Sequence, residues 1–250
     1  MNLKLDNVIV TRATKSIHRD GDMLIKLFIE RYSIADVLNE AHNLAIVEET
    51  GFKVPKLLNV QKVGNRWAIV SEFIAGKTLA QHMADDPGAA AACLERLVDV
   101  QLAMHSYSAA KLRRHADKMH AYIDQSGLDA TARYELHTRL SSLPRHAKLC
   151  HGDFCASNVI ITPSDEAYVI DWAHATQGNA SADTARSYLM FHIAGEHDHA
   201  EQYLDLFCRK SDTARQYVQK WMAIVAAGQL VKGNPEEKDF LLRWANVVEY

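Results

Sequence analysis

Hydrophobic and polar positions alternate through much of the first third of the chain, which is the pattern of β-strands. Residues 7–12 form a first short run. Residues 15–28 predict a hairpin that turns at an Asp-Gly-Asp sequence, because Asp-Gly pairs favour tight turns. Residues 56–73 predict two further strands joined by a Gly-Asn pair. The N-terminal part of the chain is therefore expected to be rich in β-structure.

Elsewhere apolar residues recur every three or four positions, which predicts helices. The first helix is expected to begin at Ser33, with Asp36 three positions later in a capping-box-like arrangement. Thr78 is expected to cap a short helix, and Asp86, followed by Pro87, to open a long one. Further helices are predicted within residues 109–143, from about residue 183, and over 211–231 and 235–248.

Two charged residues fall among these apolar positions. Lys26 alternates in register with Leu24 and Phe28 along its strand, and Glu40 lies on the apolar stripe of the first helix. A buried ammonium or carboxylate is costly without a partner, so the two could form a pair. Two plainer interpretations stay open: the buried face of the strand could be the opposite one, and Glu40 could lie at a solvated edge of its helix.

Residues 149–172 combine a predicted hairpin with polar residues that folding does not require. The loop after a short apolar strand carries Asp153 and Asn158, and the hairpin over 159–170 leads to Asp171. Two carboxylates and an amide suit phosphoryl transfer, in which one acid accepts a hydroxyl proton and oxygen ligands hold Mg²⁺. A plain hairpin with incidental polar residues is the alternative.

The sequence HGDF, an Asn after three intervening residues, and then VIDW resemble the catalytic loop and metal-binding strand of the aminoglycoside phosphotransferase family. These are small-molecule kinases of the protein-kinase-like fold, related to choline kinases. The resemblance implies an α+β fold of two lobes. Residues 1–74 would form a small nucleotide-binding N-lobe, made of an antiparallel sheet and one helix. Residues 75–250 would form a larger helical C-lobe with the catalytic loop and substrate site, and ATP would lie in the cleft between the lobes.

The resemblance also implies the roles of individual residues. Asp153 would be the base or hydroxyl positioner, and Asn158 and Asp171 would bind Mg²⁺. Lys26 would contact the nucleotide phosphates and Glu40 would hold Lys26. Further nucleotide contacts would come from Ser16 in a turn over the phosphates, from the hinge residues Glu72 and Ile74, and from Ile160.

One more acidic residue follows the catalytic region. Asp183 resembles the family's acid at a helix start, which braces the backbone of the catalytic loop. The plainer interpretation is that Asp183 caps its own helix, and the two roles are compatible.

Composition limits the classes of partner and the cellular compartment, but it does not identify a substrate. The chain has 250 residues, 48% of them hydrophobic, and a net charge of -3, which gives no general attraction to nucleic acid or to an anionic membrane. The four cysteines show no CxxC spacing, and the N-terminus shows no signal-peptide pattern. A cytoplasmic protein with free thiols is expected.

We therefore predict an ATP-dependent phosphotransferase that acts on a hydroxyl of a small molecule. The sequence does not decide between ATP and GTP as the donor, and it does not give the oligomeric state. A cationic acceptor would call for an acidic mouth, which Glu196, Asp198, Glu201, Asp205, Glu236 and Glu237 could supply. A non-catalytic nucleotide-binding module is the main alternative. A protein kinase is disfavoured, because the Gly-rich loop, the long activation loop and its phosphosite are missing.

Overall fold

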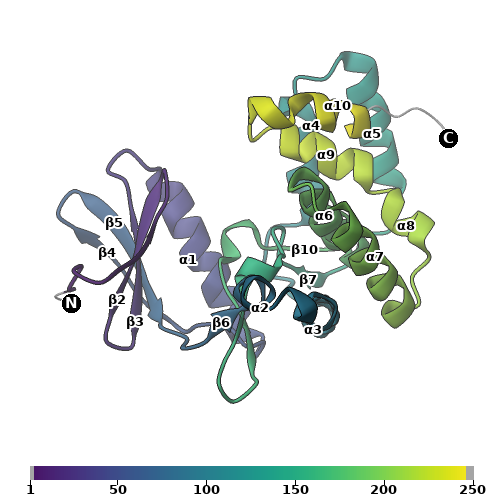
Figure 1. The fold of residues 1–250 in the computed structure, drawn as a ribbon. Coiled ribbons are helices and arrows are strands. Elements are labelled where there is room, and N and C mark those ends of the chain that lie inside the picture. The colour runs from purple at the N-terminus through teal and green to yellow at the C-terminus, as the bar shows by residue number, and fades with distance from the viewer. Residues whose placement is uncertain (1–2, 246–250) are drawn as a thin grey trace. The chain divides into compact units, whose positions relative to one another are not determined.

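A computed structural model describes residues 3–245 of the chain, and these residues fall into two compact units (Figure 1). The first unit contains residues 3–85 together with Ala156–His174, and the second contains residues 86–155 together with 175–245. We describe each unit by itself. The expected division of the chain at residue 74 stays a prediction.

A five-stranded antiparallel sheet is the centre of the first unit (Figure 1). Its spatial order is β1-β2-β3-β5-β4, so the predicted hairpins are confirmed. The expectation that Ser16 lies in a turn was wrong, since Ser16 belongs to β2 and pairs with Leu27 of β3. The strands are β1 Val8–Thr11, β2 Lys15–Asp20, β3 Met23–Phe28, β4 Leu57–Val63 and β5 Arg66–Glu72.

Both faces of this sheet are covered by apolar side chains. One face buries Ile25 and Leu27 of β3, against which Leu3 and Leu5 of the N-terminal segment pack. The other face carries Phe28, which packs with residues of helix α1 (Ile34–Glu49). The sequence left open which face of β3 is buried, and the answer is both, because a helix and the N-terminal segment each cover one side.

Helix α1 begins as predicted, since the Ser33 hydroxyl accepts a hydrogen bond from the Asp36 N–H at 3.4 Å. The first unit is completed by helix α2 (Leu79–Asp85) and by a small sheet of order β6-β8-β9. Gly76, just before β6, comes so close to β8 that a Cβ atom there would clash with the Ile161 carbonyl oxygen. The small sheet consists of β6 Lys77–Thr78, β8 Val159–Ile161 and β9 Ala167–Val169.

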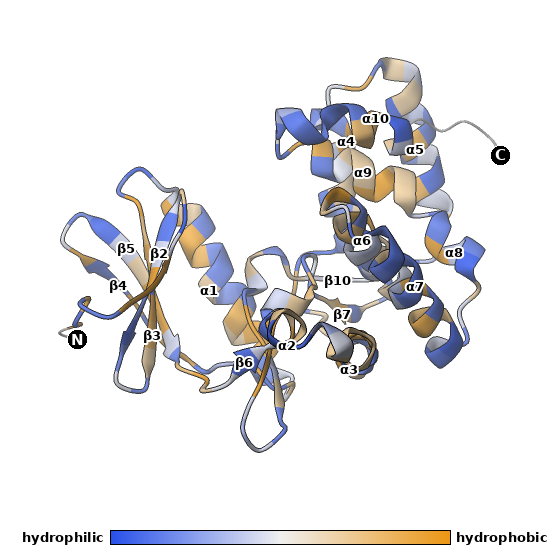
Figure 2. Cartoon of the chain, viewed as in Figure 1, coloured by the Kyte–Doolittle hydropathy of each residue, from blue (hydrophilic) through white to orange (hydrophobic). Residues whose placement is uncertain are grey.

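The second unit is mainly helical, with one short pair of antiparallel strands, β7 and β10 (Figure 1). Helix α9 is buried along nearly its whole length, whereas α7 buries one stripe of residues spaced three or four apart. Figure 2 shows the same contrast, with hydrophilic residues prevailing along α7. The elements are α3 Ala90–His105, α4 His115–Gln125, α5 Ala130–Ser142, β7 Lys148–Cys150, β10 Thr176–Gly178, α6 Ala180–Ile193, α7 His197–Ser211, α8 Arg215–Gln219, α9 Met222–Leu230 and α10 Lys238–Ala245.

The predicted helices exist, but several boundaries differ. Asp86 caps a single 3-10 turn, Pro87–Ala89, and the long helix starts after it. The helix expected over 211–231 is two helices, α8 and α9. The predicted end of the last helix, at residue 248, lies outside the described residues. No helix in the described part of the chain is both long and apolar enough to cross a bilayer.

Candidate active site

The hairpin of β8 and β9 brings two predicted metal ligands to the same end of a sheet in the first unit. Val159 pairs with Val169, and the Ile170 N–H donates to the carbonyl oxygen of Asn158 at 2.9 Å. Asn158, just before β8, and Asp171, just after β9, therefore lie at the same end of this hairpin. A carboxylate and an amide oxygen are ligands that Mg²⁺ takes in proteins, so this donor set fits the ion.

Asp171 has an unusual backbone conformation, with a φ of 66°, in the left-handed region that residues with a Cβ atom seldom occupy. The residues after it are fixed to the first unit. The Asn43 amide donates to the carbonyl oxygens of Trp172 at 3.2 Å and Ala173 at 3.3 Å, and the Trp172 indole donates to Val169 at 3.0 Å. Strain of this kind persists where surrounding contacts impose it and is frequent at functional sites.

Two lysines contact the Asp171 carboxylate, and one of them also contacts a glutamate. Lys26 Nζ lies 3.0 Å from one carboxylate oxygen and Lys15 Nζ lies 3.2 Å from the other. Lys26 also forms an ion pair with Glu40, which is buried on α1. The structure thus joins Lys26, Glu40 and Asp171 in one network, since strand β3, helix α1 and the end of β9 meet there.

The charges of this network support each other. Burial works to lower the pKa of Lys26, but Glu40 and Asp171 outweigh it and raise that pKa above its ordinary value. Burial works to raise the pKa of Asp171, but Lys26 and Lys15 hold it well below its usual range. Both groups are therefore charged near neutral pH, as a site for phosphate groups and a cation requires.

The other residues predicted to contact a nucleotide lie on the strands of the first unit. Ser16 is in β2, with its hydroxyl 2.8 Å from the His18 imidazole. The Glu72 N–H at the end of β5 already donates a hydrogen bond to the Lys56 carbonyl oxygen, at 2.9 Å. Ile74 follows β5, and Ile160 lies in β8, paired with Tyr168.

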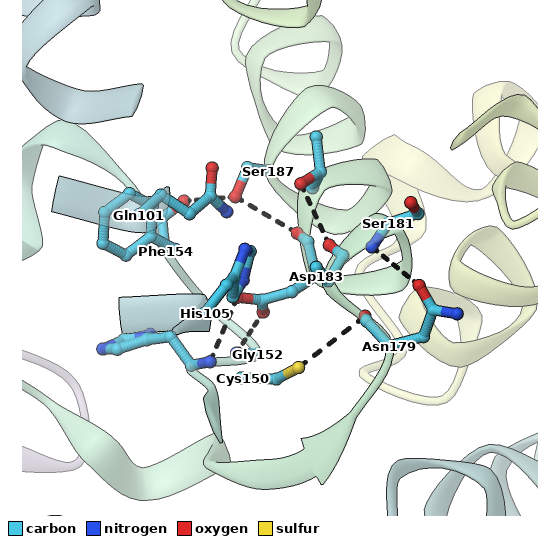
Figure 3. Close-up of polar contacts among 12 residues, drawn as sticks. Gln101, His105, Cys150, Gly152, Phe154, Asn179, Ser181, Asp183 and Ser187 are labelled. Atoms are coloured by element: carbon cyan, nitrogen blue, oxygen red, sulfur yellow. Dashed lines mark hydrogen bonds and ion pairs between the residues drawn. The ribbon is translucent and has the colours of Figure 1, made fainter. Parts of the chain in front are cut away.

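In the second unit, Asp183 holds the backbone of the loop that carries Asp153 (Figure 3). Its carboxylate accepts hydrogen bonds from the N–H groups of His151 at 3.1 Å and Gly152 at 2.7 Å, and its other contact is His105 Nε2 at 3.1 Å. Burial works to raise the pKa of Asp183, but these donors lower it. The cap of α6 is Asn179, so the alternative that Asp183 is the N-cap was wrong.

Asp183 and His105, together with Cys150, form a buried group whose spacing could hold a metal ion. The carboxylate oxygens already accept hydrogen bonds from backbone and imidazole donors. Burial raises the pKa of the Cys150 thiol well above its ordinary value, which keeps it protonated and a poor ligand. We therefore regard this group as support for the catalytic loop.

Sequence reasoning missed two residues that contact the predicted site. Lys15 reaches Asp171, and Arg186 Nη2 donates to Asp153 Oδ1 at 3.2 Å. Arg186 lies three positions after Asp183 on α6, which places both on one face of the helix. That spacing was the signal available for Arg186. For Lys15 the sequence offers only its position next to the predicted turn.

A sheet that carries a lysine–glutamate pair, an acid-bearing hairpin, and a braced loop with a further acid define the class of protein-kinase-like phosphotransferases. The family model described as the phosphotransferase enzyme family matches residues 12–218, so the chain belongs to this family. It is a phosphotransferase with a hydroxyl group as acceptor, as predicted. A search of curated proteins found no match.

Solved structures share the fold at low sequence identity, which confirms the predicted protein-kinase-like α+β fold. A thermostable mutant of aminoglycoside phosphotransferase APH(4)-Ia, in a ternary complex with AMP-PNP and hygromycin B, aligns with a TM-score of 0.69 and 16% identity, over 96% of this chain and 94% of that one. An aminoglycoside-3'-phosphotransferase of type VIII gives 0.63 and 17%, over 90% and 92%. Choline kinase LicA from Streptococcus pneumoniae gives 0.60 and 14%, over 96% and 88%.

Proposed function

We propose that the protein transfers the γ-phosphoryl group of ATP to a hydroxyl group of a small molecule. One observation carries this proposal: Lys26, held by Glu40, and Lys15 converge on Asp171, next to Asn158. Family membership supports the reaction, and the names of the structural neighbours support the substrate class. They include a complex with a nucleotide analogue and hygromycin B, and a choline kinase.

In the proposed reaction, the acceptor oxygen attacks the γ-phosphorus, and the bond from that phosphorus to the bridging oxygen of ADP breaks. ADP leaves with the bond electrons, and the hydroxyl proton passes to the Asp153 carboxylate. Asp183 keeps the backbone before Asp153 in place through Gly152 and His151. Lys26 and Lys15 offset the negative charge of the phosphates.

Asn158 and Asp171 are the residues that would hold Mg²⁺. When bound, the ion supplies positive charge to the nucleotide phosphates. Lys26 contacts one oxygen of Asp171 and is itself held by Glu40, so its position beside the carboxylate is fixed before any ligand binds. Such preorganisation lowers the cost of ordering the site during the reaction.

The test is ATP consumption by the purified protein with Mg²⁺ against a panel of small hydroxyl compounds, with the Asp153→Asn variant alongside. We expect stimulation by at least one compound, and a fall in kcat of about 10³-fold in the variant, since a general base and its charge are lost. Binding of ATP should persist in the variant. Equal turnover by both proteins would contradict the role of Asp153 as the base, and ATP binding with no turnover for any acceptor would instead favour a non-catalytic nucleotide-binding module.

A further inference from the structure

We infer that the acceptor carries an oxyanion, a phosphate or carboxylate group, in addition to its hydroxyl, and that Arg186, Lys118 and Lys232 of the second unit bind it. This inference rests on the proposed function and names the class of its substrate. It begins with Arg186, whose exposed fraction is only 9%. One arm of its guanidinium group donates to Asp153, and the other nitrogen, Nη1, is buried without a hydrogen-bond partner among the described residues.

A buried guanidinium nitrogen without an acceptor is costly, because its hydration is lost and not replaced. The planar guanidinium group matches oxyanions, which accept two parallel N–H bonds. Since Asp153 occupies one arm of Arg186, an oxyanion on the other arm would lie beside the acid that receives the hydroxyl proton. Arg186 would then fix the distance between the two functional groups of the acceptor.

Two lysines on neighbouring elements add positive charge to the same region. Helix α9 packs against both α6, which carries Arg186, and α4, which carries Lys118. The approach of α9 to α4 is close, since a Cβ atom at Gly228 would lie 3.3 Å from Met119 Sδ. Lys232 comes just after Val231, the residue that caps the end of α9. Helix α4, helix α6 and the turn after α9 therefore each carry one of these cations, on parts of the second unit that pack together.

The electrostatics of these cations agree with the packing. Burial, followed by the charges of Lys232, Arg186 and Arg113, lowers the pKa of Lys118 to about 8. Desolvation of the ammonium group and the charge of Arg186 lower the pKa of Lys232. Like charges that repel each other at short range are stabilised by an anion placed among them.

Three acids also lie near these cations: Asp153, which Arg186 contacts, Asp183 and Glu237. Asp183 is engaged by two backbone N–H groups and His105, and Glu237 accepts hydrogen bonds from Gln229 and Asn234 at 2.6 Å each. Several of the acidic residues that could have formed a mouth for a cationic acceptor also have partners. Glu201 and Asp205 both pair with Arg215. The preference for an anionic acceptor therefore rests on the buried Nη1 of Arg186, which has no hydrogen-bond partner among the described residues, and on the two lysines whose charges act on Arg186 or are acted on by it.

The first experiment compares matched acceptors at constant ionic strength, with Mg²⁺ and ATP. Two sets serve: glycerol, glycerate, glycerol phosphate and aminopropanediol, and a hexose with its 6-phosphate and its amino sugar. We expect the oxyanion-bearing members to show kcat/KM at least about tenfold above their neutral and cationic counterparts. Phosphate and carboxylate members distinguish the two oxyanions. A preference for the cationic or neutral members would overturn the inference.

Substitutions of the two lysines test whether they bind the oxyanion of the acceptor. Lys232→Met and Lys118→Met should each raise the KM of the anionic acceptor about tenfold while the KM of ATP stays within twofold, because one charge-assisted contact is lost. Lys220→Met, which removes an exposed lysine of the same unit, is the control and should change neither constant. If the two variants raise the KM of ATP instead, the anion is a nucleotide phosphate and the inference is wrong.

A binding measurement keeps the inference testable even if no acceptor in the panel reacts. Radiolabelled inorganic phosphate is the probe, with the full-length protein in equilibrium dialysis without nucleotide. We expect saturable binding that weakens about tenfold in Lys232→Met and persists in Lys26→Met, whose lysine lies in the first unit. If phosphate binds in this way but no acceptor is phosphorylated, the result counts against the proposed function and not against the oxyanion site. Binding lost in Lys26→Met but kept in Lys232→Met, or no binding at all, would overturn the inference.

Discussion

Single residues near the site illustrate how a buried charge is kept at low cost. The side chain of Asp183 is almost fully buried, and each of its oxygens accepts at least one hydrogen bond (Figure 3). Asp171 is compensated differently, by the cationic groups of Lys26 and Lys15. The difference matches the functions we assign. Backbone donors make Asp183 a buried support, whereas the Asp171 side chain stays about a third exposed beside its two lysines and is accessible to a metal ion.

Replacing Asp183 tests its part as support. Asp183→Asn keeps the shape but removes the negative charge, and it places an NH₂ group against backbone donors. We expect the free energy of unfolding to fall by about 3 kcal/mol, the usual cost of breaking a buried charged network. Urea denaturation followed by circular dichroism measures it.

Asp198→Asn is the control for Asp183→Asn, because Asp198 is an exposed residue in the first turn of α7. Its effect should stay within about 0.5 kcal/mol. Equal effects of the two substitutions would contradict a supporting part for Asp183.

At the scale of elements, helix α6 organises the catalytic loop. Asp183, Arg186 and Ser187 are spaced three and four residues apart and therefore share one face of the helix. Asp183 binds the N–H groups of residues 151 and 152, Arg186 binds the Asp153 carboxylate, and Ser187 donates to the Phe154 carbonyl at 2.7 Å. Successive residues of the loop are thus held by successive positions on one helix. The loop needs no regular structure of its own.

The cap of α6 should consequently matter for the loop. Asn179 accepts the Ser181 N–H at 2.9 Å, and its amide donates to the Tyr217 hydroxyl at 2.6 Å and the Pro144 carbonyl at 3.2 Å. Asn179→Ala should lower the free energy of unfolding by about 2 kcal/mol, because a cap and two part-buried hydrogen bonds are lost. It should also lower kcat, since the start of α6 carries Asp183.

Asp129→Ala provides the comparison for Asn179→Ala. Asp129 caps α5 through the Ala132 N–H alone, at 2.9 Å and in an exposed position. We expect a loss of about 1 kcal/mol and no change in kcat. A larger effect for Asp129→Ala than for Asn179→Ala, in either measurement, would contradict the assignment of α6 as the organiser of the loop.

At the scale of the whole molecule, the chain divides its chemistry between two units. It leaves the second unit after Cys155 and enters the first at Ala156, so the boundary falls between Asp153 and Asn158. The proposed nucleotide and metal residues belong to the first unit. The proposed base and the proposed oxyanion contacts belong to the second. Nucleotide binding and acceptor binding should therefore respond to different substitutions.

Ligand-dependent thermal stability tests this division. With Mg–ATP at about 100 times its Kd, binding adds about 2.7 kcal/mol, which should raise Tm by about 5 °C. Asp171→Ala should abolish most of this shift, because it removes a metal ligand. Asp153→Asn and Lys232→Met should keep it. A shift that survives Asp171→Ala but disappears in Asp153→Asn would contradict the assignment of nucleotide binding to the first unit. Scanning fluorimetry measures all four proteins.

Much of this protein followed from the sequence alone. The strands, the hairpin turns, most helices and the α+β fold were predictable, because side-chain periodicity and turn chemistry act between neighbours in the chain. The phosphotransferase family was predictable from the residues between His151 and Trp172, since phosphoryl transfer calls for acids and an amide at fixed spacing. Lys26 and Glu40 were singled out because charges among apolar neighbours call for partners.

Other features were decided only by tertiary structure. Lys15 meets Asp171 across 156 positions of sequence, and Arg186 meets Asp153 across 33. No local period records such contacts, because they depend on how strands and helices pack. Packing also buried both faces of β3 and made Asn179, not Asp183, the cap of α6. The charge around the proposed acceptor site arises in the same way, since its cations come from three separate elements.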